Sequence, residues 1–242
     1  MAALNYDFDW SVLWRAPYGE MFARGILTTI ALSLAAWTLA MGLGLCVGAM
    51  RMQPFAPLRR LGALYVHLFR NTPFLVQLFF WYFAAPLLLP KAGQRWLYDN
   101  VPDYAFLAGV VGLGMYTASR VAEQFRSGFL SIPRDQYRAA FASGLTTRQA
   151  YRFVLAPYAF RLALPTLTTE FLTCFKNSAL AMTIGVMEIT HTASHVEAFT
   201  SHGLETTTAA SLVYLTLAWT VIVLMAVVER RLRIPGLIAR GG

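Results

Sequence analysis

The chain has 242 residues, of which 57% are hydrophobic and only 13% charged, and its formal net charge at pH 7 is +8. Soluble domains carry roughly 25% charged residues. A soluble all-helical protein of this length would have to hide several helices that are hydrophobic on every side, which one small core cannot do. The composition therefore predicts an all-α, polytopic membrane protein.

Uncharged stretches along the chain predict its membrane-spanning helices. Three of them, of 26, 20 and 23 residues, lie at 25–50, 71–90 and 206–228. Each reaches the roughly 20 residues that cross about 30 Å of hydrocarbon. Weaker candidates are 104–119 and 162–187, the latter with two ionisable residues. We expect five spans in a single transmembrane domain, 1–242, near 22–50, 64–89, 104–122, 160–186 and 206–228.

The distribution of basic residues predicts the orientation. The segments after the first, third and fifth predicted spans hold 15 of the 20 Lys and Arg residues, whereas the segment between the fourth and fifth spans holds three Glu and no Lys or Arg. The positive-inside rule then places the two long loops and the C-terminus in the cytoplasm and the N-terminus outside. This asymmetry explains the net charge, so we expect no nucleic-acid partner.

The first two predicted spans contain patterns that leave alternatives open. Gly44 and Gly48 have a spacing that lets a second helix approach closely, although a merely flexible glycine-rich helix would show the same pattern. Residues 70–73, Arg-Asn-Thr-Pro, suit a helix start with a polar cap and a proline in the first turn. The aromatic run at 79–83 favours lipid contact and packing over a substrate-lining role.

The segment after the third span, 131–157, predicts a short helix–turn–helix. Residues 131–133 mark a break, and 135–143 form a helix that Gly144 ends as its C-cap. Thr146 and Gln149 have the spacing of a capping box and begin a second helix. We expect Pro157 to interrupt that helix, and Pro165 to lie in the first turn of the fourth span.

This helix pair has the features of a docking site on the cytoplasmic surface. The Ala139–Ala140 pair offers a flat surface that inserts into a groove without a clash. Arg138, Arg148 and Arg152 supply charge that complements an acidic partner. An amphipathic helix pair that seeks anionic lipid would have the same spacing.

The same segment resembles the EAA loop of ATP-binding-cassette (ABC) importer permeases, E-A-A-x3-G-x9-I-x-L-P, with every spacing kept. Four positions match, Ala139, Ala140, Gly144 and Pro157, and three differ, Arg138 for Glu, Val154 for Ile and Ala156 for Leu. Further segments, at 70–82, 122–126, 164–165, 176–178 and 184–188, resemble the polar amino-acid permease subfamily. Residues 117–124 and 228–236 resemble the glutamate/aspartate permeases in particular.

The resemblance implies a type I ABC importer permease in the bacterial inner membrane. Two cytoplasmic ATPase subunits would clasp the loops at Arg138, Ala139, Ala140, Gly144 and Pro157. A second permease, homologous or identical, and a solute-binding protein outside would complete the assembly. The sequence has no Gly-x4-Gly-Lys-Ser/Thr phosphate loop, so we expect ATP and Mg on the partner subunits, no cofactor in this chain and no enzymatic activity of its own.

The implied substrate is an amino acid, glutamate or aspartate, with glutamine, arginine or histidine as alternatives. An acidic substrate needs a cation, and Arg120 lies about 24 Å along a helix that begins near Tyr104. Its guanidinium fork can bind a carboxylate with two bonds, or it can snorkel to the inner headgroups. Glu170 could receive the substrate amine, but pairing with an arginine is favoured. Thr117 belongs to the same candidate substrate site.

The remaining ionisable residues suggest other roles. Lys176 and Asn177, in a Lys-Asn-Ser motif of the subfamily, are expected at a gate or subunit interface. The spacings of His191, His195 and His202 lack a third metal-ligand pattern, so a wet outer surface is favoured over a metal site. A secondary carrier would favour inverted repeats, and an intramembrane enzyme needs a nucleophile–base pair. We find neither pattern, and so expect no catalytic residues.

Overall fold

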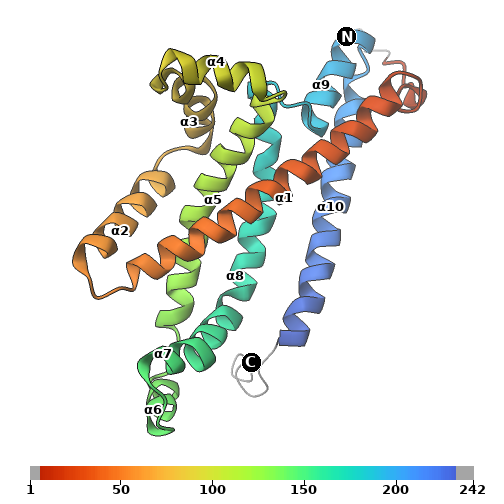
Figure 1. Cartoon of the computed structure of the whole chain (residues 1–242). Helices are drawn as coiled ribbons and strands as arrows, with labels where there is room; N and C mark the ends of the chain where they lie inside the picture. Colours follow the sequence, from red (N-terminus) through yellow and green to blue (C-terminus); the bar gives the residue numbers. More distant parts are fainter. Residues whose placement is uncertain (1–5, 233–242) are drawn as a thin grey trace, which may run out of the picture. The chain divides into compact units, whose positions relative to one another are not determined.

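The computed structural model describes residues 6–232, and every regular element in that range is helical (Figure 1), which confirms the all-α class. The four long helices are α1 (Tyr18–Arg51), α5 (Tyr104–Leu130), α8 (Ala156–Asn177) and α10 (Gly203–Leu232). The shorter α-helices are α2 (Ala56–Asn71), α3 (Phe74–Phe79), α4 (Lys91–Asn100), α6 (Arg134–Ala142), α7 (Thr147–Ala150) and α9 (Ile189–Thr200). Short 3-10 or π segments are η1 (Trp10–Leu13), η2 (Phe80–Ala84), η3 (Ala85–Leu88), η4 (Tyr151–Leu155) and η5 (Ser178–Ile184).

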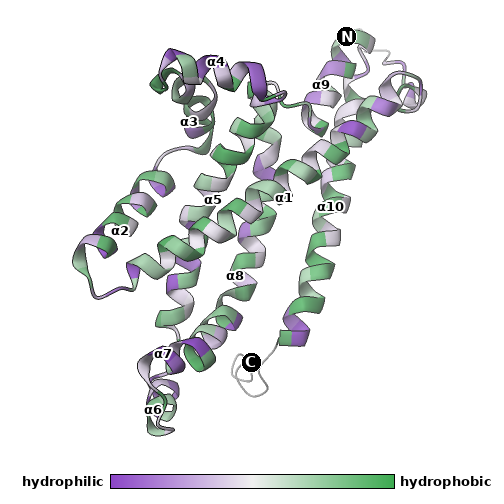
Figure 2. Ribbon diagram, viewed as in Figure 1, coloured by the Kyte–Doolittle hydropathy of each residue, from purple (hydrophilic) through white to green (hydrophobic). Residues whose placement is uncertain are grey.

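Three of these helices, α1, α5 and α10, are long and apolar enough to cross a membrane. The most apolar window of α10 has a mean hydropathy of 2.3, and none of it is buried inside the chain. Figure 2 shows this helix hydrophobic along most of its length, with hydrophilic residues at its end. Such a surface suits lipid. The count of five spans stays a prediction, and both chain ends, 1–5 and 233–242, lie outside the described residues.

Contacts within the chain define two compact units. Unit 1 joins 1–36, 74–113 and 174–219, and unit 2 joins 37–73, 114–173 and 220–242. Unit 1 has a core in which α9 packs against the start of α1 and α10, with members Val12, Phe22, Ile189, Ala193, Val196 and Ala210. Unit 2 has a core built largely from small residues, Ala40, Ala118, Val121, Ala163 and Leu167. The single domain over 1–242 stays a prediction.

Small residues let α1 and α5 approach closely within unit 2. A Cβ atom added to Gly44 would lie 2.7 Å from Val121 Cβ and 2.9 Å from the Ala118 carbonyl oxygen. Both distances are below normal van der Waals contact. Gly44 therefore serves close helix packing, as the glycine spacing had suggested.

The predicted second span, 64–89, is not one helix. The chain leaves helical geometry at Thr72, where φ is −96° and ψ is 133°, and α3 begins only at Phe74. The cause is Pro73, because the ring of a proline forces the residue before it into extended backbone. The Thr72 hydroxyl donates to the Leu68 carbonyl, so one of the carbonyl groups in the last turn of α2 has a hydrogen-bond partner.

The two prolines around the start of the fourth predicted span also differ from expectation. Pro157 does not end the helix, because α7, η4 and α8 follow one another without a gap, although the hydrogen-bond pattern changes just before the proline. A π-helical segment, η4, precedes it, and the Ala156 N–H bonds back to the Tyr151 carbonyl. Pro165 lies inside α8 rather than in its first turn, because the helix begins at Ala156. The predicted span 160–186 is α-helical only to Asn177 and continues as the 3-10 segment η5.

Candidate functional site

A largely buried charge pair joins α5 to α8 in unit 2. Arg120 Nε donates to Glu170 Oε2 at 2.6 Å, and the side chains are 32% and 7% exposed. Gln124 Nε2 donates to the other carboxylate oxygen at 3.0 Å. A buried carboxylate tolerates its charge only when its oxygens are paired in this way. The predicted pairing of Glu170 with an arginine is confirmed.

The residues around Arg120 form a polar stripe on α5. Tyr116, Arg120 and Gln124 lie four residues apart, which places them on one face of the helix. Arg120 Nη1 donates to the Tyr116 hydroxyl at 3.4 Å, and the guanidinium carbon lies 5.8 Å from the centroid of the same ring. The sequence analysis missed Tyr116 and Gln124, although their spacing around Arg120 was the signal that could have found them.

Arg120 has more hydrogen-bond donors than its two partners use. A guanidinium carries five N–H groups, and within residues 6–232 Arg120 donates through Nε to Glu170 and through Nη1 to Tyr116. The side chain is about one-third exposed. A second carboxylate can therefore bind the open edge of the guanidinium while Glu170 holds the other edge and fixes its orientation.

The other predicted site residues have different surroundings. Thr117 is 2% exposed, so the chain itself covers its side chain. Lys176 is exposed in the last turn of α8, and Asn177 is the last residue of that helix. The roles assigned to all three residues stay predictions.

The predicted coupling loop folds as a rigid helix pair in unit 2. α6 ends at Ala142, and Gly144 has φ of 75°, the left-handed conformation that glycine adopts without strain. The capping box of Thr146 and Gln149 is present in full. Both features confirm the sequence-based interpretation of this turn.

Apolar residues from the end of α5, the turn after it, the end of η4 and the start of α8 form the core of the loop. They are Phe129, Ile132, Leu155, Tyr158 and Ala159, all 8% exposed or less. Tyr137 of α6 packs against them, and burial raises the pKa of its phenol. The loop is therefore anchored on two long helices of the same unit.

The exposed surface of the loop differs from the one expected. Ala139 is exposed but Ala140 is only 3% exposed, so the alanine pair does not form one flat outer surface. The reason is helical geometry, since consecutive residues point about 100° apart. Aromatic side chains occupy the outer surface instead, and the sequence analysis did not single them out: Phe141, Tyr151 and Phe153 are 44%, 42% and 63% exposed.

Arginines accompany these aromatic residues. Arg138, Arg148 and Arg152 are all exposed, and the guanidinium carbon of Arg152 lies 5.7 Å from the Phe153 ring centroid. The pair of Arg138 with Asp135, at 3.7 Å, is fully solvated and contributes little to stability. Exposed aromatic rings beside arginines are the composition that protein interfaces favour.

The segment between α8 and α10 belongs to unit 1 and is organised by a buried carboxylate. Glu188 accepts hydrogen bonds from the Thr190 and His191 N–H groups, at 2.9 and 2.8 Å, and from the Tyr214 hydroxyl at 2.7 Å. Burial raises the pKa of this carboxyl, while these hydrogen bonds oppose the shift. The rings of His191 and His195 are 6.4 Å apart, and no group of three or more metal-ligating side chains occurs within residues 6–232.

Residues 40–234 match the protein family described as binding-protein-dependent transport system inner membrane component. The chain belongs to this family of membrane transport proteins. Over 241 residues it is 40% identical to the glutamate/aspartate import permease protein GltJ of Escherichia coli (strain K12), across 96% of this chain and 98% of that protein. It is 28% identical to the glutamate/aspartate import permease protein GltK of Escherichia coli O6:H1, across 93% of this chain and 99% of that protein.

A solved structure agrees with this assignment. The fold is similar to a chain of an amino acid ABC transporter crystallised with histidines, with a TM-score of 0.79 and 30% identity, over 93% of this chain and all of that one. The family, the relatives and the structural similarity confirm the resemblance to amino-acid ABC permeases that the loop motif indicated.

Proposed function

We propose that this chain is a permease subunit of an ATP-driven importer of acidic amino acids. The observation that carries the proposal is Arg120, a cation on α5 that one carboxylate orients and whose outer edge stays open. The 40% identity to a glutamate/aspartate import permease over nearly the whole chain supports the same substrate class.

In this proposal Arg120 binds one carboxylate of the substrate. Glu170 keeps the guanidinium in place and would receive the substrate amine only by giving up one of its two bonds, to Arg120 or Gln124, while Thr117 lies one turn away on α5. Lys176 and Asn177 take part in gating or in the interface with a second permease. The similarity to both GltJ and GltK supports a pair of homologous permeases, and an identical pair is the alternative.

The energy for transport comes from partner subunits in this proposal. Two ABC ATPases that bind ATP and Mg would bind the loop through Arg138, Ala139, Gly144, Pro157 and the exposed aromatic residues, while Ala140 packs on its inner side. Their closure would shift the permease between two states, each open to one side. A solute-binding protein outside delivers the amino acid. The positive-inside rule supports a cytoplasmic loop in the bacterial inner membrane, with the N-terminus outside.

Reconstitution in proteoliposomes tests the proposal. The permease, its partner permease, the ATPase and the binding protein from the same operon should take up aspartate and glutamate only with ATP inside. Unlabelled aspartate should compete, and glutamine, arginine and histidine should not. Uptake by this chain alone on an ion gradient would contradict the importer. Preferential uptake of glutamine would support the assignment as an importer but contradict the acidic substrate.

A further inference from the structure

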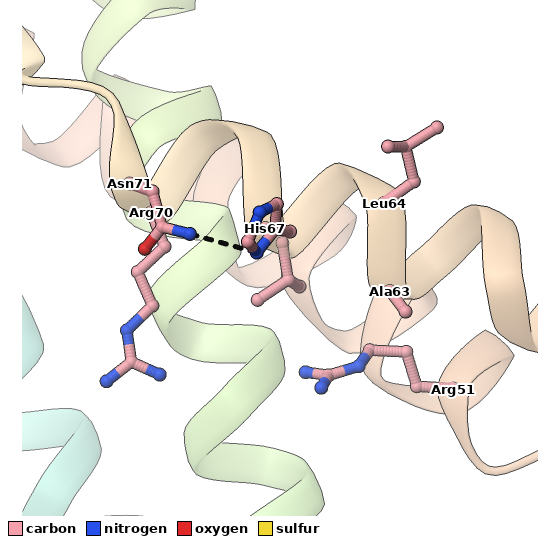
Figure 3. A pocket seen from close by; sticks show the side chains of 7 residues that line it. Arg51, Ala63, Leu64, His67, Arg70 and Asn71 are labelled. Atoms are coloured by element: carbon pink, nitrogen blue, oxygen red, sulfur yellow. Dashed lines mark hydrogen bonds between the residues drawn. The ribbon is translucent and has the colours of Figure 1, made fainter.

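A basic pocket lies between the end of α1 and α2 (Figure 3), and neither Arg120 nor Glu170 is among its lining residues. Its volume is about 690 Å³. The lining residues are Arg51, Ala63, Leu64, Val66, His67, Arg70 and Asn71, all of unit 2. Figure 3 shows the guanidinium groups of Arg51 and Arg70 on one side of α2, beneath His67. The pocket thus combines cationic and hydrogen-bonding groups with an apolar floor.

The positive charge in and around this pocket exceeds the negative charge. Arg51 pairs with Glu123, which Arg126 also contacts at 3.5 Å. Arg70 is exposed and forms no ion pair within 4 Å in the described part of the chain. One carboxylate therefore faces three guanidinium groups, and the pocket has net positive charge for an anion.

His67 adds a second kind of hydrogen-bonding side chain to the pocket lining. The Asn71 amide nitrogen lies 2.9 Å from His67 Nδ1. An amide nitrogen donates, so Nδ1 accepts, and the ring proton of the neutral imidazole then lies on Nε2. This arrangement leaves an N–H group of the ring for a ligand.

The outer face of α2 is apolar. Leu61, Leu64 and Leu68 are 58%, 62% and 58% exposed, and their spacing of three and four places them on one helix face. Leu64 also lines the pocket, so the apolar face and the basic pocket adjoin. A free phosphate would use only the pocket, whereas a phospholipid would use the pocket and the face.

We propose that this pocket binds the phosphate of an anionic phospholipid, whose acyl chains lie along the leucine face of α2. Arginine forks match phosphate oxygens with two parallel hydrogen bonds. Basic pockets beside membrane helices on the cytoplasmic side are suited to anionic headgroups. The positive-inside rule predicts that this pocket faces that leaflet.

Lipid retention by the assembled transporter tests the proposal. The complex is placed in nanodiscs that contain equal amounts of phosphatidylglycerol and phosphatidylcholine, extracted in mild detergent and analysed by native mass spectrometry. We expect the wild type to retain phosphatidylglycerol in preference, and Arg70→Gln to retain at least fivefold less. Arg60→Gln is the matched control, since Arg60 is an exposed arginine of α2 outside the pocket and its replacement should retain the wild-type amount.

A second variant separates the lipid from other occupants. Leu64→Gln keeps every charge of the pocket, and it should also lower phosphatidylglycerol retention. Equal retention by Arg70→Gln and Arg60→Gln would overturn the proposal. Displacement of the lipid by millimolar inorganic phosphate would assign the pocket to free phosphate instead. Efficient disulfide formation between two copies carrying Leu64→Cys would assign the leucine face to a protein interface, and would also overturn it.

Discussion

Removing the charge of Arg120 should have two effects that a paired substitution can separate. Arg120→Gln leaves Glu170, whose side chain is 7% exposed, with Gln124 as its remaining recorded side-chain partner. Breaking a buried ion pair on one side costs about 3–5 kcal/mol. Because Arg120 itself is 32% exposed, the lower end, about 3 kcal/mol, is expected. For a chain of this size that corresponds to a fall in unfolding temperature of roughly 6–12 °C.

The double variant Arg120→Gln/Glu170→Gln removes both charges. The glutamine at 120 lacks the guanidinium group, but its amide nitrogen reaches about as far as Arg120 Nε, so the two amides can still form a hydrogen bond. The double variant leaves no unpaired charge in the helix interface, and buried amides that hydrogen-bond to one another carry little net penalty. The unfolding temperature in detergent should therefore return to within a few degrees of the wild type. Uptake of aspartate should not return, because the double variant still lacks the cation that we propose binds the substrate.

The loss of transport can be estimated in the same way. A hydrogen bond to a charged group contributes about 1.5–3 kcal/mol, which is about a 10- to 150-fold change in the aspartate concentration for half-maximal uptake. The assay is ATP-driven uptake of labelled aspartate into proteoliposomes. A double variant that is stable and transports aspartate like the wild type would refute substrate contact and leave Arg120 a purely structural role.

Three further outcomes follow from the geometry. Gly144→Val should lower the free energy of unfolding by about 1–2 kcal/mol, because φ at this position is 75°, and it should lower substrate-stimulated ATPase activity. Asparagine tolerates this conformation, so Gly144→Asn should lower the ATPase activity less. Equal effects of the two substitutions would contradict the argument. Phe153→Ser should weaken ATPase-subunit binding at least tenfold in a pull-down titration without changing the unfolding temperature, whereas Phe8→Ser, at a similar exposure of 61%, should not change binding. Glu188→Ala should lower the free energy of unfolding by about 1–2 kcal/mol, because α9 loses its N-terminal cap. Glu188→Gln keeps a hydrogen-bond acceptor and should lower the unfolding temperature less when both variants are unfolded by heat.

Local sequence patterns predicted most of the local structure. Uncharged length predicted α1 and α10, and it gave α5 only as a weaker candidate behind 71–90, which is not a single helix. The capping-box spacing of Thr146 and Gln149 predicted the start of α7. These features depend on residues within a few positions of one another. The π-helical segment before Pro157 was not predicted, because a proline, which lacks an N–H, can either end a helix or be accommodated by a wider turn, and its presence alone does not decide between the two.

In the candidate site, too, the sequence predicted the features that depend on residue type but not those that depend on packing. The sequence identified Arg120 and Glu170 as ionisable residues in apolar spans, and predicted that Glu170 pairs with an arginine. It did not identify which arginine, since that depends on the packing of α5 against α8. The exposure of Phe153 and the burial of Ala140 likewise depend on which side of the loop contacts the apolar core.

The charge pair and the loop lie on the same two helices, which links them physically. α5 runs from Arg120 to Leu130 and then enters the loop, and α8 leaves it at Ala156 and runs to Glu170. At the α-helical rise these distances are about 15 Å and about 21 Å. If a partner that binds the loop moved the end of α5 relative to the start of α8, the 2.6 Å hydrogen bond between Arg120 and Glu170 would lengthen or break, because such bonds weaken steeply beyond about 3.2 Å. The strength with which Arg120 holds a substrate carboxylate would therefore depend on the position of the loop, which is the coupling that an ATP-driven importer requires.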